Sequence, residues 1–216
     1  MNKTDLKLYA ITDRQWLHGA SLSEHVKLAI EGGATMIQIR DKDILSTDSD
    51  AGLKDEYNEA LEIKRICHEH KVPLIINDNV QFAIDIDADG VHLGQDDMNP
   101  AEARKLLGTD KIIGVTAKTV EQAKRAEADG ADYLGSGAVF GSTTKLNAKP
   151  MTKELLREIT AAVDIPVVAI GGINADNAST LKGTGIAGIA VVGAIFASAD
   201  IKAAARKLAE ICDNML

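Results

Sequence analysis

Residues 166–172 read PVVAIGG and residues 188–193 read GIAVVG, two short apolar runs that each end at glycine. Both are rich in β-branched and other apolar residues, which favours buried β-strands. Six comparable runs come earlier in the chain: LYAIT (8–12), TMIQI (35–39), PLIIN (73–77), GVHLG (90–94), IIGVT (112–116) and DYLGSG (132–137). Several of these runs are apolar nearly throughout, as expected of parallel strands that are covered on both faces of the sheet.

Segments with helical spacing separate the runs. Apolar residues fall at positions 26, 29 and 30, and residues 121–128 are a run of strong helix formers. The alternation predicts eight β-α units and hence an α/β fold, a (β/α)₈ TIM barrel that uses residues 1–216 as a single domain. The alternative, an open doubly wound sheet, usually has fewer strands. Residues 41–55 are the least regular stretch and are predicted to be a long loop, either a lid or a solvated excursion.

Composition narrows the function classes. The chain has 216 residues, of which 45% are hydrophobic, and this excludes a disordered protein. No apolar run reaches the roughly 18–20 residues of a membrane helix, and the first residues lack the apolar stretch of a signal peptide, so we expect a cytoplasmic protein with no membrane partner. The net charge of −8 argues against a nucleic-acid partner but allows a local cationic pocket for a phosphorylated small molecule. The oligomeric state stays open.

Polar residues at the ends of the predicted strands are the candidates for function, because TIM barrels place their active sites there. The second run leads into the sequence QIRDK. Strand alternation puts Gln38, Arg40 and Lys42 on one side, and two cations with an amide suit a cluster of anionic oxygens. The alternative is a solvated loop in which Arg40 pairs with Asp41.

Carboxylates follow the third and fourth predicted strands. Asp78 and Asp97 end neighbouring strands, so they could face one another beside the cations and form a Mg²⁺ site that shares its remaining ligands with phosphate. The alternative is helix capping, by Asp78 or Asn79 at one helix and by Asp97 with Asn99 at the next. The residues alone leave both interpretations open.

Oxygen-binding groups also follow the sixth, seventh and eighth predicted strands. After the sixth come small residues, three hydroxyls and a lysine, at Ser142, Thr143, Thr144 and Lys145. Glycines follow the seventh and eighth strands, where TIM barrels often bind a phosphate at a short helix N-terminus. The residues concerned are Gly171, Gly172, Val192 and Gly193.

Two further patterns have ordinary structural explanations. Residues 183–188 match GxGxxG, but they precede a strand instead of following one, so a turn is predicted. His92 lies within the fourth strand and is either a core histidine with internal hydrogen bonds or a metal ligand.

The order of these motifs resembles the thiamin phosphate synthase family, whose members are (β/α)₈ enzymes. The resemblance extends from LYAITDR (8–14) to VVGAI (191–195). Its most specific parts are QIRDK (38–42), IINDN (75–79), DGVHLGQDD (89–97), STTK (142–145) and AIGGI (169–173).

The resemblance implies a Mg²⁺-dependent transferase of thiamin biosynthesis. It would join a hydroxymethylpyrimidine pyrophosphate to a thiazole phosphate by ionisation followed by capture, releasing pyrophosphate. It also implies that Arg40, Lys42 and Lys145 are catalytic, and that Asp78 and Asp97 hold the metal. The implied substrate contacts are Gln38, Ile39, Arg40, Asp41, Lys42, Asn77, Thr116, Ser142, Thr143, Thr144, Lys145, Gly172, Val192 and Gly193. Thr116 stands where the family commonly has serine, and Ser142 where it usually has threonine.

Two other functions remain as alternatives. A thiazole tautomerase-like isomerase of the same fold would not need Arg40 or the two carboxylates, and it would favour a histidine near Thr116. A non-catalytic binder of thiamin precursors could keep the phosphate-binding glycines alone. Mg²⁺-dependent release of pyrophosphate separates the synthase from both.

Overall fold

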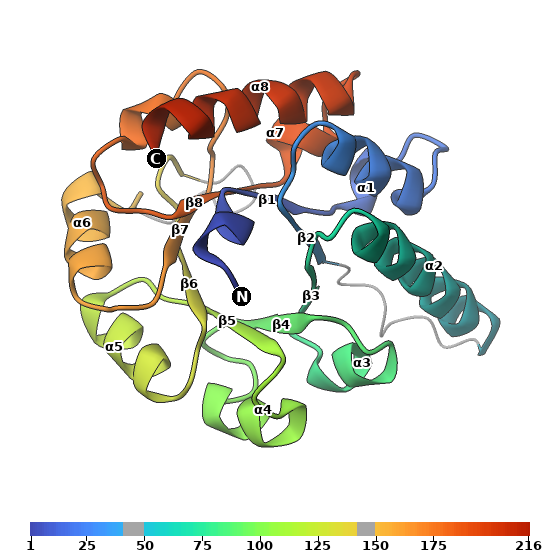
Figure 1. The fold of residues 1–216 in the computed structure, drawn as a ribbon, viewed down its shortest axis with the longest axis horizontal. Helices are drawn as coiled ribbons and strands as arrows, with labels where there is room; N and C mark the ends of the chain where they lie inside the picture. Colours follow the sequence, from blue (N-terminus) through green and yellow to red (C-terminus); the bar gives the residue numbers. More distant parts are fainter. Residues whose placement is uncertain (41–49, 142–149) are drawn as a thin grey trace.

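A computed structural model describes residues 1–40, 50–141 and 150–216, without the side chains of residues 50–54. Within these ranges eight parallel strands pair in sequence order, and the eighth pairs with the first to close the barrel seen end-on in Figure 1. The predicted TIM barrel is therefore confirmed. The strands are β1 (Leu8–Ile11), β2 (Met36–Ile39), β3 (Leu74–Asn77), β4 (Gly90–Leu93), β5 (Ile112–Thr116), β6 (Tyr133–Gly137), β7 (Val167–Ile170) and β8 (Gly188–Val191).

Helices surround the ring of strands (Figure 1). They are α1 (Leu22–Glu31), α2 (Asp50–Glu69), α3 (Val80–Asp85), α4 (Pro100–Leu107), α5 (Val120–Ala128), α6 (Lys153–Ala161), α7 (Gly193–Phe196) and α8 (Ile201–Met215), with the 3₁₀ helices η1 (Lys3–Leu6), η2 (Arg14–Trp16) and η3 (Ala178–Leu181). Short polar side chains accept a backbone N–H at the starts of six of the α-helices and fix where these helices begin. These N-caps are Ser21, Asn79, Asn99, Thr119, Thr152 and Asp200.

Strand alternation produces two separate cores. Side chains such as Leu8 and Ala10 point outward and pack against the helices, whereas Tyr9 and Ile11 belong to a cluster inside the barrel. Leu6 of η1 joins the inner cluster and is fully buried. Because η1 lies across the middle of the ring in Figure 1, it covers the end of the barrel at which the strands begin.

The predicted loop at residues 41–55 is wrong for its last part, because α2 begins at Asp50. Residues 41–49 lie outside the described residues. The helix forms because Ala60, Ile63 and Cys67 fall on one face and are buried in the outer core. The polar first turns of this long helix resemble a loop in sequence, since only the later turns carry the apolar pattern.

The expectation of a helical segment after every strand also needs correction at the seventh connection, which contains the 3₁₀ helix η3 instead of an α-helix. Side chains in this connection hydrogen-bond to the nearby backbone. Asn177 Oδ1 accepts from the backbone N–H of Asn174, and Thr180 Oγ1 donates to the backbone carbonyl of Asn177. Such contacts compete with α-helical hydrogen bonds. The predicted turn after η3 is confirmed, with positive φ at Gly183 and Gly185. No helix of the described residues is both long and apolar enough to span a membrane.

Candidate functional site

A cavity of about 900 Å³ opens among the ends of the strands and is large enough for a small organic ligand. Its wall brings together residues from β1, β2, β3, β4, β5 and β6 on one side and from the loops after β7 and β8 on the other. Eight residues predicted from the sequence line it: Gln38, Arg40, Asn77, Thr116, Gly171, Gly172, Val192 and Gly193.

The end of β2 directs alternate side chains to opposite sides. Gln38 and Arg40 line the cavity, as strand alternation predicts. Ile39, between them, packs in the outer core, so its side chain faces away from the cavity. The backbone N–H of Arg40 donates to Thr12 Oγ1 over 3.1 Å, which ties this strand end to β1.

Asp78 and Asp97 lie together at the ends of β3 and β4, beside the cavity, and we call them the carboxylate pair. Their carboxyl groups are in hydrogen-bonding contact. The amide of Asn77 donates to Asp78 Oδ2 over 2.6 Å, and the backbone N–H of Gly94 donates to Asp97 Oδ2 over 2.7 Å. These contacts hold both carboxylates in place at the strand ends.

Helix capping does not account for the carboxylate pair. The cap of α3 is Asn79, whose side-chain oxygen accepts from the backbone N–H of Phe82 over 2.9 Å. The cap of α4 is Asn99, which accepts from Ala101 over the same distance. The two asparagines therefore perform the capping that the sequence had left open.

The environment of the carboxylate pair favours a positive ligand. Partial removal from water raises the pKa of Asp78 to about 6, and the hydrogen bond and negative charge of Asp97 act in the same direction. The side chain of Asn77 and the charge of Arg40 lower the same pKa by smaller amounts. Two carboxylates held this close repel one another when both are ionised, and a bound cation relieves that repulsion.

The pair suits Mg²⁺, which binds few protein oxygens and keeps sites for phosphate and water. Within the described residues there is no group of three or more His, Cys, Asp and Glu side chains placed to hold a metal ion. The assignment of Asp78 and Asp97 as metal ligands stays a prediction.

The loops after β7 and β8 form the opposite wall of the cavity. Gly171 and Gly172 have φ of 99° and 68°, a backbone region that side chains other than glycine rarely adopt. Asn177 Nδ2 donates to the carbonyl of Gly172 over 2.9 Å and fixes the loop. After β8, Gly193 begins the short helix α7. Glycine backbone thus faces the cavity at both positions where the sequence predicts a phosphate.

Six of the predicted site residues lie outside the described residues: Asp41, Lys42, Ser142, Thr143, Thr144 and Lys145. The alternative, an ion pair between Arg40 and Asp41, also lies outside the described residues, because it involves Asp41. Both segments begin directly after residues that line the cavity, Arg40 and Gly141.

His92 has internal hydrogen bonds, as one of its two interpretations predicts. Its Nδ1 lies 3.0 Å from the Tyr133 hydroxyl and its Nε2 lies 3.1 Å from Thr116 Oγ1. Burial lowers the pKa of His92 to about 4, so the ring is neutral at pH 7. Both ring nitrogens are occupied by protein groups.

Sequence reasoning missed Tyr9, Trp16 and Phe140, all of which line the cavity. The signal for Tyr9 is its position in an apolar strand, because a buried tyrosine hydroxyl needs a polar partner. Trp16 ends the short 3₁₀ helix η2 and Phe140 lies in a loop, and neither segment has a periodicity that indicates which way a side chain faces.

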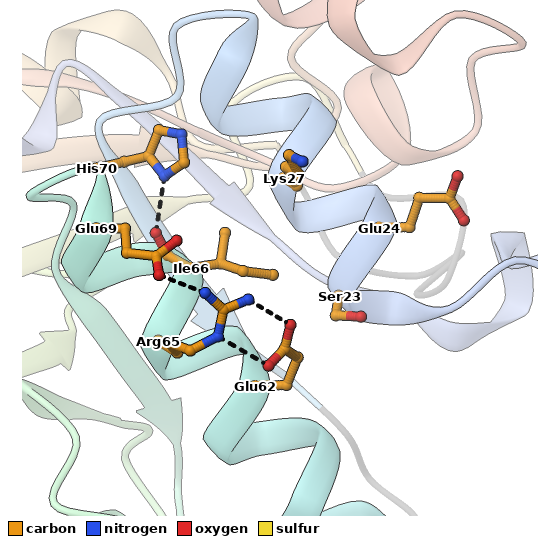
Figure 2. Close-up of a pocket in the computed structure, with 8 residues that line it drawn as sticks. All are labelled: Ser23, Glu24, Lys27, Glu62, Arg65, Ile66, Glu69 and His70. Carbon is orange, nitrogen blue, oxygen red and sulfur yellow. Dashed lines mark hydrogen bonds and ion pairs between the residues drawn. The ribbon is translucent and has the colours of Figure 1, made fainter.

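A smaller hollow of about 210 Å³ lies between α1 and α2 on the outside of the barrel (Figure 2). Several of its polar side chains already have partners on α2. Arg65 bonds to Glu62 and Glu69, and Nδ1 of His70, the residue after α2, lies 2.9 Å from the carbonyl oxygen of Ile66. It is remote from the strand ends, so the central cavity is the better candidate site.

Comparison with known proteins agrees with this choice. Residues 8–195 match the family model described as thiamine monophosphate synthase. A thiamine-phosphate synthase of Ruminiclostridium cellulolyticum is 48% identical over 99% of this chain and 98% of its own length. The synthase of Clostridium novyi is also 48% identical, over 95% of this chain and 98% of its own.

A solved structure, the thiamine phosphate pyrophosphorylase of Pyrococcus furiosus, superimposes with a TM-score of 0.87. It is 38% identical and the match covers 99% of this chain and 98% of that one. The family match extends from the first residue of β1 to the third residue of α7, and so includes every strand end that contributes to the cavity. The chain belongs to the thiamine monophosphate synthase family.

Proposed function

We propose that this chain catalyses the Mg²⁺-dependent condensation of 4-amino-5-hydroxymethyl-2-methylpyrimidine pyrophosphate with 4-methyl-5-(2-phosphoethyl)thiazole. The products are thiamin phosphate and pyrophosphate, and the described barrel is the catalytic unit. One observation carries the proposal: a single cavity is lined by the cation Arg40 after β2 and by glycine backbone after β7 and β8, and the carboxylate pair lies directly after Asn77, which also lines it. Such a cavity can hold two different phosphorylated substrates at once.

The pyrimidine pyrophosphate is assigned to the wall formed by β2 to β5. Gln38 and Asn77 offer amide groups to the ring and its substituents, and Arg40 offers a planar, permanently charged fork to the phosphate oxygens. Thr116 lines the same wall with a hydroxyl. By resemblance to the family, Lys42 and Lys145 complete the cationic surroundings of the pyrophosphate, and Asp41 is a further substrate contact.

The carboxylate pair would hold Mg²⁺. Its two oxygen-bearing side chains match the hard ligands that Mg²⁺ prefers. Desolvation, together with the hydrogen bond and negative charge of Asp97, raises the pKa of Asp78, and a bound cation would favour the ionised form. When bound, the ion would neutralise charge on the pyrophosphate and make it a better leaving group.

The thiazole phosphate is assigned to the opposite wall. Glycine backbone at Gly172 and Gly193 lets amide groups approach an anion without a side chain between them. Val192 lines the cavity between these loops. By resemblance, Ser142, Thr143 and Thr144 add hydroxyl contacts to this phosphate.

The reaction needs little covalent chemistry from the protein. The bond between the pyrimidine methylene carbon and the pyrophosphate oxygen breaks, and its electron pair leaves with pyrophosphate. Arg40 stabilises the developing negative charge. The electron-rich aminopyrimidine stabilises the methylene cation, and the lone pair of the thiazole nitrogen then forms the new C–N bond. Apolar residues such as Ile11, Ile170 and Ala190 line the cavity and limit attack by water.

The proposal is tested by mixing purified protein, Mg²⁺ and both substrates and measuring thiamin phosphate and pyrophosphate together. We expect the two products in equal amounts. Conversion of a thiazole carboxylate tautomer without any pyrimidine substrate would identify an isomerase. Binding of the thiazole phosphate without product would identify a binder, and either result would contradict the synthase.

Arg40→Gln separates a catalytic contribution from a general effect of charge. The variant is expected to lower kcat/KM for the pyrimidine substrate about 100-fold or more, because the leaving group loses its cationic partner. The matched control is Arg125→Gln on α5, whose side chain is 78% exposed. Equal activity of the two variants would remove Arg40 from the mechanism.

A further inference from the structure

A continuous chain of hydrogen bonds crosses the interior of the barrel, and all its members except Tyr133 line the cavity. Gln38 Nε2 donates to the Tyr9 hydroxyl over 2.5 Å, and the hydroxyls of Tyr9 and Tyr133 are 2.8 Å apart. The Tyr133 hydroxyl then contacts Nδ1 of His92, and Nε2 of His92 contacts Thr116 Oγ1. We call these five residues the relay. Its two ends, Gln38 and Thr116, line the cavity wall assigned to the pyrimidine substrate.

The relay has one consistent direction when it is followed from Gln38. The Tyr9 hydroxyl accepts from Gln38 Nε2, so its single hydrogen goes to its other hydrogen-bond partner, Tyr133. The Tyr133 hydrogen then goes to Nδ1 of His92. A neutral imidazole that accepts at Nδ1 carries its hydrogen on Nε2, which donates to Thr116 Oγ1.

The opposite direction requires every member to turn over together. Thr116 would donate to His92, His92 to Tyr133, Tyr133 to Tyr9, and Tyr9 to the oxygen of a flipped Gln38 amide. Each hydroxyl has one hydrogen and the neutral ring has one, so no single member can reverse alone without leaving two acceptors or two donors in contact. The orientation of the Gln38 amide therefore determines whether the Thr116 hydroxyl accepts from His92 or donates to it.

The surrounding strands leave room for two aromatic members of the relay, Tyr133 and His92. A Cβ atom at Gly114 of β5 would lie 2.3 Å from the Tyr133 hydroxyl oxygen. A Cβ at Gly135 of β6 would lie 3.1 Å from Cε1 of His92. Glycine at these two positions gives both rings the room that the hydrogen bonds require.

We propose that Tyr133 is a positioning residue, which through Tyr9 and His92 holds the Gln38 amide with Oε1 toward the cavity and the Thr116 hydroxyl hydrogen toward the substrate. The inference rests on the proposed function. It assigns Gln38 as an acceptor that selects a ring bearing an N–H donor, and Thr116 as a donor to an oxygen acceptor. Tyr133 itself is fully buried and is not among the residues that line the cavity, so it acts only through its neighbours.

Tyr133→Phe tests the proposal because it removes one oxygen from a residue that does not meet the substrate. The Tyr9 hydroxyl then lacks its acceptor and can donate to Gln38, which frees the amide to flip. We expect the preference for the 4-aminopyrimidine pyrophosphate over its 4-oxo analogue, measured as a ratio of kcat/KM values, to fall at least tenfold. The lower chemical reactivity of the oxo analogue cancels when the variant is compared with the wild type.

Tyr57→Phe is the matched control. It also removes one tyrosine hydroxyl with a hydrogen bond, in this case to the carbonyl of Asp85 on the outside of the barrel. Its preference should equal that of the wild type. An unchanged preference in folded Tyr133→Phe would overturn the proposal, whereas failure of the wild type to form thiamin phosphate would overturn the proposed function instead.

The direction of the relay can be measured without turnover, which covers the case in which Tyr133→Phe does not fold. Two-bond ¹⁵N–¹H correlation spectra distinguish the tautomers of a neutral histidine, and the signal of His92 is identified by its loss in His92→Gln. We expect the hydrogen on Nε2 at pH 7. A hydrogen on Nδ1, or a charged ring, would contradict the proposed direction.

Discussion

Asp78 has an unusual backbone conformation and a carboxyl group with a raised pKa. Its φ of 61° lies in the left-handed region, which aspartate tolerates better than most residues but which still costs free energy. Its backbone N–H donates to the carbonyl of His92 over 2.8 Å, so the end of β3 is fixed against β4. That geometry brings the carboxylate beside Asp97 and raises its pKa. The backbone thus holds two carboxylates, which repel one another when both are ionised, at the site proposed for Mg²⁺.

The raised pKa predicts a pH dependence of stability in the metal-free protein. Between about pH 4 and pH 6 folded Asp78 holds a proton that the unfolded chain, with an ordinary pKa of 3.8, releases. The contribution of Asp78 to the free energy of unfolding therefore falls as pH rises through this window. Because the side chain is exposed to solvent, we expect a loss of only about 1 kcal/mol.

Asp78→Asn should abolish this loss. Urea unfolding in the presence of a chelator, at pH 4.5 and pH 7, measures it, and the variant is expected to be the more stable protein at pH 7 alone. A variant that is destabilised equally at both pH values would show that Asp78 is not strained by its neighbour.

At the scale of elements, the loop after β7 depends on backbone that only glycine provides readily. A Cβ at Gly172 would lie 2.8 Å from the carbonyl oxygen of Gly141 and 3.0 Å from Cβ of Phe140, in addition to the strain of its positive φ. The loop after β6 and the loop after β7 therefore support one another at the cavity wall. A change in one displaces the other.

Gly172→Ala is expected to raise the KM for the thiazole phosphate tenfold or more, because the methyl group displaces the phosphate-binding wall. Gly183→Ala is the matched control, with φ of 78° and no atom within 4 Å of the added Cβ. Gly183→Ala should lose about 1 kcal/mol of stability through backbone strain, and Gly172→Ala should lose more, because its Cβ also crowds the carbonyl oxygen of Gly141. Steady-state kinetics that show equal KM values for the two variants would count against the assigned phosphate wall.

Element prediction from the sequence succeeded where periodicity is strong. The strands at residues 74–77 and 112–116 were predicted to within a residue, because buried parallel strands are nearly continuous apolar runs. The start of α2 could not be predicted, since Ala60 is the first buried residue among the described side chains of this helix, from residue 55 on. The 3₁₀ helix η3 depends on local side-chain contacts that have no period.

Prediction of the site residues also succeeded where a regular pattern applies and failed where three-dimensional placement decides. Gln38 and Arg40 could be predicted to share a side because strands alternate, and the glycines because TIM barrels reuse one phosphate position. Which oxygens cap helices and which meet one another depends on three-dimensional placement, so Asp78 and Asn79 could not be told apart. Tyr133 could not be found at all, because it acts behind the cavity wall.

At the scale of the whole molecule, the cavity proposed for activity and a network proposed to stabilise the fold lie at opposite ends of the barrel. The cavity lies at the ends of the strands, whereas a network around Arg104 lies where β5 and β6 begin. The Arg104 guanidinium donates to the carbonyls of Gly108, Lys111 and Gly130 and to Asp132 Oδ2. It thereby ties α4 to the first residues of two neighbouring strands.

Arg104→Met is expected to lower the free energy of unfolding by about 2–4 kcal/mol, because three carbonyls and a carboxylate lose a partly buried donor. At a temperature where the variant is folded, its kcat/KM should equal that of the wild type. Arg65→Met is the control, since Arg65 is exposed and pairs only within α2 among the described residues, so it should cost less than about 1 kcal/mol. Loss of activity in folded Arg104→Met would show that the two ends of the barrel are coupled.

The central claim is that the carboxylate pair holds the Mg²⁺ on which pyrophosphate release depends. The most direct measurement is the initial rate of thiamin phosphate formation against Mg²⁺ concentration, in the wild type, in Asp97→Asn and in Asp96→Asn. Asp96 carries the same charge one residue away and is the matched control. We predict that half-maximal activity in Asp97→Asn requires at least tenfold more Mg²⁺, while Asp96→Asn follows the wild type. Identical Mg²⁺ curves for all three proteins, or full activity with a chelator, would contradict the account.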